Sequence, residues 1–290
     1  MNIRLLTLIS TIVFSLPFTT VQAKATENVI YWAGCGITKK AFMKELATAY
    51  TQKTGIEINL KGGGATRGIR DTVAGKLDIG GTCRMSLPGA DKTELHASLH
   101  PVAWDALAVI AHKSNPLDDL SISQIKDIYT GKITSWKQLG GEDKPIKLYV
   151  RRGKISGVGY AIRQYIFKDG GMDFVSENVV KSSGPLEKAA EKDPYAMGIT
   201  GVSSARKRDV KIIKFDGKSP TYENVKNGSY GLYRPLYLVS NPNPSKIAKN
   251  FITYATSEEG REIIRQNGTV PYRDAPKLLS KMLIYGFDVK

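Results

Sequence analysis

The chain has 290 residues, of which 41% are hydrophobic and 24% charged, an ordinary composition that excludes a disordered chain and supports a substantial core. It carries 42 Lys and Arg against 27 Asp and Glu, and the resulting net charge of +15 raises the local concentration of anions. These basic residues are spread along the chain instead of forming one arm, which argues against a nucleic-acid-binding protein.

The first 23 residues have the pattern of a secretory signal peptide. Arg4 supplies the positive charge, residues 5–16 are almost continuously apolar, and Val21-Gln22-Ala23 has the small residues of a cleavage site. No later segment approaches the roughly 20 consecutive apolar residues that span a bilayer. We therefore expect a soluble, periplasmic or secreted protein that begins near Lys24.

The segment that follows alternates between short apolar runs and helical spacing. Residues 29–32 and 56–60 are β-prone runs, whereas residues 42–50 and 67–74 have apolar side chains at helical intervals. A further short strand is expected at residues 77–80. Such alternation predicts an α/β fold with a mostly parallel sheet. In sheets of this kind, ligands bind at the carboxyl ends of the strands.

Turn-forming residues after the apolar run at 106–111 indicate a boundary between two lobes. Beyond it we expect helices at 123–129, 158–167, 248–255 and 258–266, and strands at 146–150 and 236–239. The last two helices are expected to return to the first lobe, so that two crossings form a hinge. The predicted organisation is a signal peptide (1–23), the first part of lobe 1 (24–110), lobe 2 (111–234) and a return to lobe 1 (235–290).

Three loops, at residues 34–38, 62–66 and 153–157, each follow a predicted strand and open a predicted helix. Glycines let the backbone approach a ligand, and the free N–H groups and dipole of a helix N-terminus favour an anion. Thr38, Thr66 and Ser156 add hydroxyl donors, and Arg152 adds a forked guanidinium. Each loop alone is typical of an ordinary helix cap, but the three together favour a site for a small anion.

Two cysteines, Cys35 and Cys83, are expected at the ends of adjacent strands on the wall of the cleft. In an exported protein they indicate one structural disulfide. If they are reduced, the thiols would instead contact a soft partner such as a thiophilic oxyanion or a metal ion. Two thiols without a matched histidine make a metal site the less favoured alternative, so we expect no metal and no cofactor.

The chain lacks the patterns that would indicate an enzyme. His96, His100 and His112 have no catalytic spacing, and neither a Gly-x-Ser-x-Gly motif nor paired carboxylates are found. Residues 157–162 match a dinucleotide-binding fingerprint only in part, because no acidic residue follows at the required distance. We therefore predict a binding protein.

Several motifs occur in an order and spacing that extend over nearly the whole mature chain. They lie at residues 62–69, 77–80, 128–136, 152 with 156–157, 219–222, 233–237 and 267–271. Over residues 32–272 the chain resembles the phosphate-type solute-binding proteins of bacterial ABC transporters. The resemblance implies a type II periplasmic binding protein fold, with two lobes that are each a mostly parallel sheet flanked by helices and are joined by a two-segment hinge.

The resemblance also implies which residues hold the ligand, because the family binds its anion between the lobes with backbone amides, hydroxyls and an arginine. By matched position, the ligand-binding residues are Ile37, Thr38, Ala65, Thr66, Cys83, Arg152, Ser156, Gly157 and Val158. Ala65 replaces a usual serine, Val158 a usual threonine, Cys83 an aspartate or serine, and Cys35 a common glycine. These departures leave the identity of the anion open, with phosphate as the first candidate.

The function that this resemblance implies is capture of a small oxyanion between two lobes and its delivery to an ABC permease. An alternative is a periplasmic sensor subunit that binds another oxyanion, such as arsenate or arsenite, with Cys35 and Cys83 at the site and a membrane sensor as partner. A phosphatase-like hydrolase is disfavoured, because no nucleophile and base are found. We expect a monomer that has no nucleic-acid partner.

Overall fold

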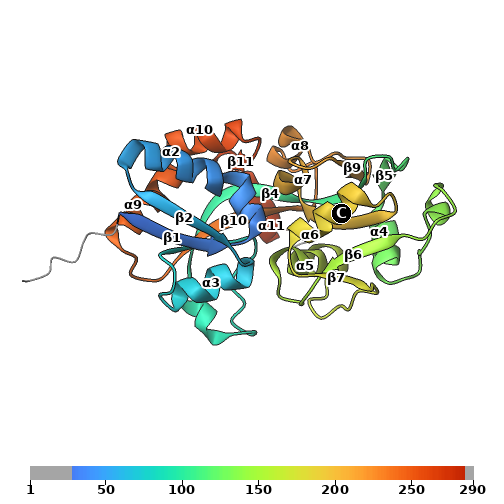
Figure 1. The fold of residues 1–290 in the computed structure, drawn as a ribbon, viewed down its shortest axis with the longest axis horizontal. Coiled ribbons are helices and arrows are strands. Elements are labelled where there is room, and N and C mark those ends of the chain that lie inside the picture. Colours follow the sequence, from blue (N-terminus) through green and yellow to red (C-terminus); the bar gives the residue numbers. More distant parts are fainter. Residues whose placement is uncertain (1–27, 285–290) are drawn as a thin grey trace, which may run out of the picture.

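The computed structural model describes residues 28–284, which form two parts that lie side by side (Figure 1). The predicted signal peptide at 1–23 lies outside the described residues. Between residues 28 and 284, no helix is long and apolar enough to cross a membrane.

Strands and helices alternate along most of the described chain. The strands are β1 (Val29–Gly34), β2 (Glu57–Gly62), β3 (Ile79–Thr82), β4 (Ser98–His112), β5 (Asp119–Leu120), β6 (Lys147–Arg151), β7 (Asn178–Val180), β8 (Ala196–Gly201), β9 (Val210–Phe215), β10 (Tyr233–Ser240) and β11 (Val270–Pro271). The helices are α1 (Gly36–Thr38), α2 (Lys44–Thr54), α3 (Ala65–Val73), α4 (Ile122–Tyr129), α5 (Gly157–Ile162), α6 (Ser183–Lys192), α7 (Val202–Ala205), α8 (Tyr222–Lys226), α9 (Lys246–Thr256), α10 (Glu258–Gln266) and α11 (Lys277–Ile284). Short π-helical segments, Lys39–Met43 and Arg163–Phe167, join α1 to α2 and extend α5, and 3₁₀ turns lie at Lys92–His96, Trp136–Leu139 and Tyr272–Asp274.

The described strands form one sheet in the order β2-β1-β3-β10-β4-β8-β6-β7, with β11 and β9 beside β4, and β5 beside β9. β1 lies between β2 and β3 and is parallel to both, and β6 is likewise parallel to β7 and β8. β4 and β10 run antiparallel to their neighbours. The α/β fold predicted from the sequence is confirmed, and the two antiparallel strands make the sheet mixed.

The long strand β4 connects the two parts. Its first half pairs with β10 and β11 as far as Ala106, whereas its second half pairs with β8 and β9 from Leu107. The apolar run at 106–111 is therefore the buried second half of a strand that begins at Ser98. The chain returns just before β10, where the Leu107 N–H donates to the Leu232 carbonyl oxygen at 2.8 Å. Lobe boundaries at 110 and 234 stay a prediction.

Glycines let helix α3 lie directly on β1 and β3. A Cβ at Gly68 would lie 2.4 Å from the Gly81 carbonyl oxygen, and one at Gly34 would lie 2.2 Å from the same atom. A Cβ at Gly80 would lie 1.9 Å from the Gly68 carbonyl oxygen. Only glycine fits such close backbone contacts. This packing brings the loop that precedes α3 next to the carboxyl ends of β1 and β3.

Helices α9 and α10 pack beside α2 on the first part of the molecule (Figure 1). Tyr50 of α2 makes an edge-to-face contact with Phe251 of α9, with ring centroids 5.1 Å apart, and a second ring contact with Tyr254 at 5.0 Å. Such aromatic pairs add to the stabilisation from apolar burial. The last third of the chain thus packs against its beginning.

Candidate ligand-binding site

The first loop starts where β1 ends at Gly34 and passes directly into α1. Cys35 is the N-cap residue of α1, and its N–H donates to the Gly81 carbonyl oxygen at 2.8 Å. Ile37 and Thr38 are buried in the first turn, and Thr38 Oγ1 has no hydrogen-bond partner. The loop therefore presents a buried helix start and one available hydroxyl at the carboxyl end of β1.

The second loop lies between β2 and α3. Gly64, the N-cap residue of α3, has a φ of 87°, in the region that favours glycine. Ala65 follows it and is buried. Thr66 Oγ1 accepts a hydrogen bond from Arg84 Nη2 at 3.2 Å and donates to the Ile155 carbonyl oxygen at 3.4 Å. The Thr66 hydroxyl therefore links the two parts of the molecule.

The third loop lies between β6 and α5 in the second part. The Oγ of Ser156, which precedes α5, is buried and has no hydrogen-bond partner. Gly157 and Val158 begin the helix and are buried. A Cβ at Gly157 would lie 2.3 Å from Cys83 Sγ, so this glycine contacts the first part directly. The three loops predicted from the sequence thus meet between the two parts.

The buried arginine beside the third loop is not the one that the sequence indicated. Arg152 is exposed, and its backbone N–H donates to the Val180 carbonyl oxygen at 2.8 Å. Arg151 is buried, and it donates from Nη1 to Ser183 Oγ at 2.9 Å and from Nη2 to the Lys181 carbonyl oxygen at 3.0 Å. Its Nε has no partner. The structure thus places Arg151 inside and Arg152 outside, because β6 ends at Arg151 and Arg152 begins the exposed turn.

A second buried arginine, Arg234 of β10, was missed in the sequence analysis. It is 1% exposed, its Nη1 donates to the Gly157 carbonyl oxygen at 3.2 Å, and its Nη2 lies 3.6 Å from Asp105 Oδ2. Within the described part of the chain, its Nε and Nη2 have no hydrogen-bond partner. Burial lowers the pKa of Arg234, but Cys83 and Asp105 together raise it above its ordinary value. An arginine inside the apolar run at 232–239 was the available signal, since fully buried charges are rare.

The two cysteines follow the adjacent parallel strands β1 and β3 and meet between the two parts. Both are buried free thiols whose sulfurs lie 2.6 Å apart. The hydrogen bond with Cys83 lowers the pKa of Cys35 to about 6 against the effect of burial, and Arg234 and the backbone N–H groups of Thr38 and Ile37 lower it further. The same hydrogen bond and burial raise the pKa of Cys83 well above its ordinary value. The disulfide between them stays a prediction.

Several buried donor atoms from these elements have no hydrogen-bond partner among residues 28–284. They are Thr38 Oγ1, Ser156 Oγ, Arg151 Nε, and Arg234 Nε and Nη2. A buried polar group without a partner costs about 1–3 kcal/mol. Hydroxyl and guanidinium donors are the groups that satisfy the oxygens of an anion. Unpaired donors of this kind on the loops and strands that meet here are suited to binding a small oxyanion.

Polar contacts hold the two parts together around these donors. Lys40, which follows α1, pairs with the buried Glu187 of α6 at 2.8 Å. Arg84, which follows β3, donates from Nε to the Ile155 carbonyl oxygen of the third loop at 2.9 Å. These contacts hold the first part against the second.

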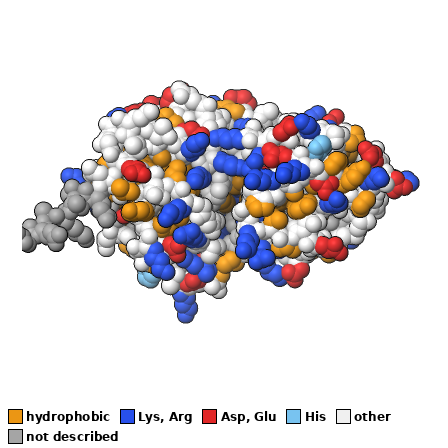
Figure 2. All heavy atoms as spheres, in the orientation of Figure 1, with side chains coloured by type: hydrophobic (Ala, Val, Ile, Leu, Met, Phe, Trp, Pro, Cys, Tyr) orange, Lys and Arg blue, Asp and Glu red, His pale blue; other side chains and the backbone are white. Residues whose placement is uncertain are grey.

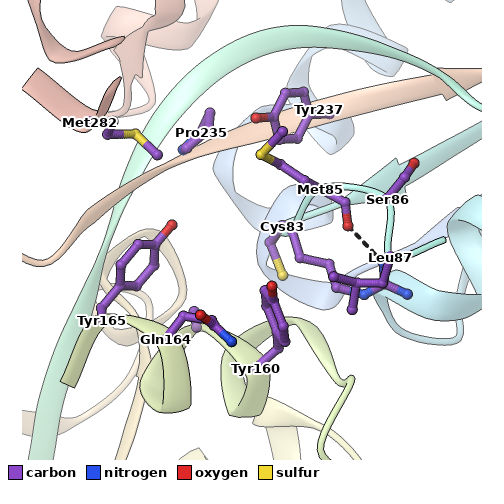
Figure 3. A pocket seen from close by; sticks show the side chains of 12 residues that line it. Cys83, Met85, Ser86, Leu87, Tyr160, Gln164, Tyr165, Pro235, Tyr237 and Met282 are labelled. Carbon is purple, nitrogen blue, oxygen red and sulfur yellow. Dashed lines mark hydrogen bonds between the residues drawn. The ribbon is translucent and has the colours of Figure 1, made fainter. Parts of the chain in front are cut away.

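A cavity of about 160 Å³ lies beside Cys83 (Figure 3). Its lining comes from both parts and from β10, with Met85 on one side, Tyr160 and Tyr165 on another, and Tyr237 above them in Figure 3. The sulfur of Cys83 points toward Tyr160 in this view. The Cys83 side chain therefore lies at the wall of this cavity.

Comparison with known proteins agrees with this geometry. A family model for the PBP superfamily domain matches residues 30–259. The chain belongs to the PBP superfamily. The predicted resemblance to phosphate-type solute-binding proteins, and with it the type II periplasmic binding protein fold, is confirmed by the relatives of this PBP protein.

Two phosphate-type structures match this PBP chain over nearly their whole length. A substrate-binding protein of the phosphate ABC transporter type from Clostridium perfringens, solved with bound phosphate, is 31% identical, covers 84% of this chain and 99% of its own, and gives a TM-score of 0.75. An ABC-type phosphate transport receptor from Vibrio cholerae is 27% identical, with 83% and 99% coverage and a TM-score of 0.64. The phosphate-binding protein PstS of Bacillus subtilis strain 168 is 28% identical over 223 residues, which are 75% of this chain and 72% of that protein.

Proposed function

We propose that this protein captures inorganic phosphate between its two parts and passes it to an ABC permease. The observation that carries the proposal is the set of buried donors without partners, supplied by Thr38 in the first part, Arg151 and Ser156 in the second, and Arg234 in β10. An anion bound by all of them contacts both parts at once. Its binding energy therefore favours the closed arrangement over an open one.

The choice of phosphate among oxyanions rests on the charges and on the relatives. Arg234 keeps two unpaired donor atoms, Nε and Nη2, that suit a forked contact with a tetrahedral oxyanion, and Arg151 adds its charge and its Nε. The Bacillus subtilis relative is named a phosphate-binding protein, and the Clostridium perfringens structure contains phosphate. Ala65 and Val158 bring no hydroxyl to their loops, so we expect more of the affinity to depend on Arg151 and Arg234 than on hydroxyl donors.

We further propose that this is a monomeric periplasmic or secreted receptor and not an enzyme. The signal-peptide pattern at 1–23 supports export, and the Vibrio cholerae relative is named a transport receptor. The unpaired donors suit binding. The three histidines of the sequence, His96, His100 and His112, do not have the spacing of a catalytic base beside a nucleophile. An ABC permease is the partner that fits a receptor of this kind.

Isothermal titration with phosphate, sulfate and arsenate tests the proposal. We expect saturable phosphate binding at one site, and no heat with any of the three anions would contradict an oxyanion receptor. Arg151→Ala should weaken phosphate binding about 30-fold or more, because removal of a buried, hydrogen-bonded charge costs about 2–5 kcal/mol. The neighbouring Arg152→Ala is the matched control, since its side chain is exposed. Loss of binding in Arg152→Ala alone would instead support the sequence-based prediction that Arg152 binds the ligand.

A further inference from the structure

The Cys35–Cys83 pair is the part of the site that the proposed function does not use. The chain contains only these two cysteines, and their buried sulfurs lie 2.6 Å apart. A disulfide bond is about 2.05 Å long, so oxidation needs only a small approach of the two sulfurs. No ligand atom fits between sulfurs at this separation. The geometry therefore favours a direct bond over a metal or arsenic atom that bridges the thiols.

In the reduced pair, Cys35 lies among the groups that we assign to the anion. It is the N-cap residue of α1, and the backbone N–H groups of Ile37 and Thr38 stabilise its thiolate, as does Arg234. Burial lowers the pKa of Arg151, and the negative charge of Cys35 opposes this effect. Arg151 therefore also interacts electrostatically with the thiolate. A thiolate at Cys35 thus places a negative charge at the N-terminus of α1, where we expect the phosphate to bind.

We propose that a reversible Cys35–Cys83 disulfide sets the charge of the phosphate site, so that the oxidised protein binds phosphate tightly and the reduced protein binds it weakly. In the reduced state the Cys35 thiolate occupies the amides and repels the ligand, whereas the disulfide carries no charge and leaves Arg151 and Arg234 to phosphate. This inference rests on the proposed phosphate-binding function and adds redox control of the same site.

We place the exchange with a small thiol in the cavity that Cys83 lines. A thiolate in the cavity attacks Cys83 Sγ, which forms a mixed disulfide and releases Cys35 as a thiolate, the better leaving group because of its lower pKa. A second thiolate attacks the reagent sulfur of the mixed disulfide, and Cys83 leaves and takes a proton from water. The two reagent thiolates are oxidised to one disulfide, and the protein disulfide accepts their two electrons. Oxidation by a small disulfide is the reverse of these steps.

The charge mechanism predicts a specific pH dependence. The titratable and charged groups around Cys35 are Cys83 after β3, Arg234 of β10 and Arg151 of β6, with Asp105 of β4 beyond Arg234. Because the pKa of Cys35 is about 6, the reduced pair carries its negative charge above that pH and loses it below. The disulfide has no such titration, so the two forms should differ most at neutral and higher pH.

The test is titration of inorganic phosphate into the full chain that has been equilibrated with oxidised or reduced dithiothreitol, with thiols counted in each sample. We expect no free thiols and tight binding in the oxidised form, and two free thiols with at least tenfold weaker binding in the reduced form at pH 7.5. The ratio of the two dissociation constants should fall toward one below pH 5. Phosphate also becomes more negative as the pH rises over this range, and because the thiolate repels a dianion more than a monoanion, both titrations change the ratio in the same direction.

The double variant Cys35→Ser/Cys83→Ser is the control, and its phosphate affinity should not respond to dithiothreitol at any pH. Thermal melting of this variant checks that it is folded. Equal affinity of the oxidised and reduced wild-type forms, tighter binding by the reduced form, a ratio that does not change with pH, or two thiols that persist in oxidised dithiothreitol would each overturn the inference while the phosphate function stands. Absence of phosphate binding in both forms would instead refute the proposed function and the inference with it.

Discussion

At the scale of single residues, the contact between Gly157 and Cys83 decides how closely the two parts approach. Gly157 begins α5 in the second part, and its carbonyl oxygen accepts a hydrogen bond from Arg234. A Cβ on this residue would lie 2.3 Å from Cys83 Sγ and 3.1 Å from Ala65 Cβ. The first separation is far shorter than van der Waals contact and the second is tighter than most Cβ contacts, so a side chain here forces Cys83 or α5 to shift.

We therefore expect Gly157→Ala to weaken phosphate binding about fivefold or more. Forcing an extra methyl group into a packed contact costs about 1–3 kcal/mol, and here that cost falls on the closed arrangement. Isothermal titration measures the effect. Gly184→Ala, in α6 of the same part, is the control because a Cβ there has no atom within 4 Å. Equal phosphate affinities of the two variants would show that closure does not depend on the Gly157 contact.

At the scale of elements, the buried carboxylate of Glu187 connects α6 to the helix that starts at α1. Glu187 of α6 is 0% exposed and accepts from Lys40 Nζ at 2.8 Å, as well as from Thr200 and Ser204. Burial alone would raise the pKa of Glu187, but these hydrogen bonds and the charge of Lys40 hold it below its ordinary value of 4.5. The ion pair therefore stabilises the contact between the two parts at every pH at which Glu187 is charged.

Glu187→Gln should lower the melting temperature and weaken phosphate binding, because loss of the carboxylate leaves Lys40 and Arg208 without their buried partner. We expect a loss of about 1–3 kcal/mol in stability. Since the folded pKa of Glu187 is depressed, its contribution is present above pH 4.5 and disappears as the pH falls through the lower folded value. The difference in melting temperature between wild type and variant should accordingly shrink in acid.

Glu191→Gln provides a matched control within α6. Glu191 is partly exposed and pairs with Arg208 at 3.4 Å, a contact worth at most about 1 kcal/mol. Differential scanning fluorimetry over pH 3–7, with and without phosphate, separates the two carboxylates. Identical melting curves for Glu187→Gln and Glu191→Gln would contradict the role that we assign to the buried pair.

The same elements show what the sequence could and could not predict. Helix α10 at 258–266 and the loops before α1, α3 and α5 were predicted from local signals, namely apolar periodicity and glycines after apolar runs. Which of the two arginines, Arg151 or Arg152, is buried depends instead on whether β6 ends at residue 151 or 152. Apolar periodicity does not locate the end of a strand to within one residue. Arg234 and Asp105 come together only when β10 pairs with β4, a contact between segments far apart in the sequence.

At the scale of the whole molecule, the positive charge is large and unevenly distributed over the surface. The net charge is +15, and Lys and Arg side chains gather along the boundary between the two parts on the face shown in Figure 2. The guanidinium groups of Arg151 and Arg234 are buried and add two positive charges near Cys35. A field that is concentrated at the binding site raises the rate at which an anion reaches it.

This field predicts that phosphate association slows as salt is added. The Debye length falls from about 10 Å at 0.1 M to about 3 Å at 1 M salt, so the surface charges are screened over that range while the buried arginines are not. We expect the association rate constant, measured by stopped-flow fluorescence in sodium chloride, to fall about tenfold between low and high salt. The dissociation rate constant should change much less, because it reflects the buried contacts. A dissociation rate that carried all of the salt dependence would mean that the surface charge does not guide the ligand.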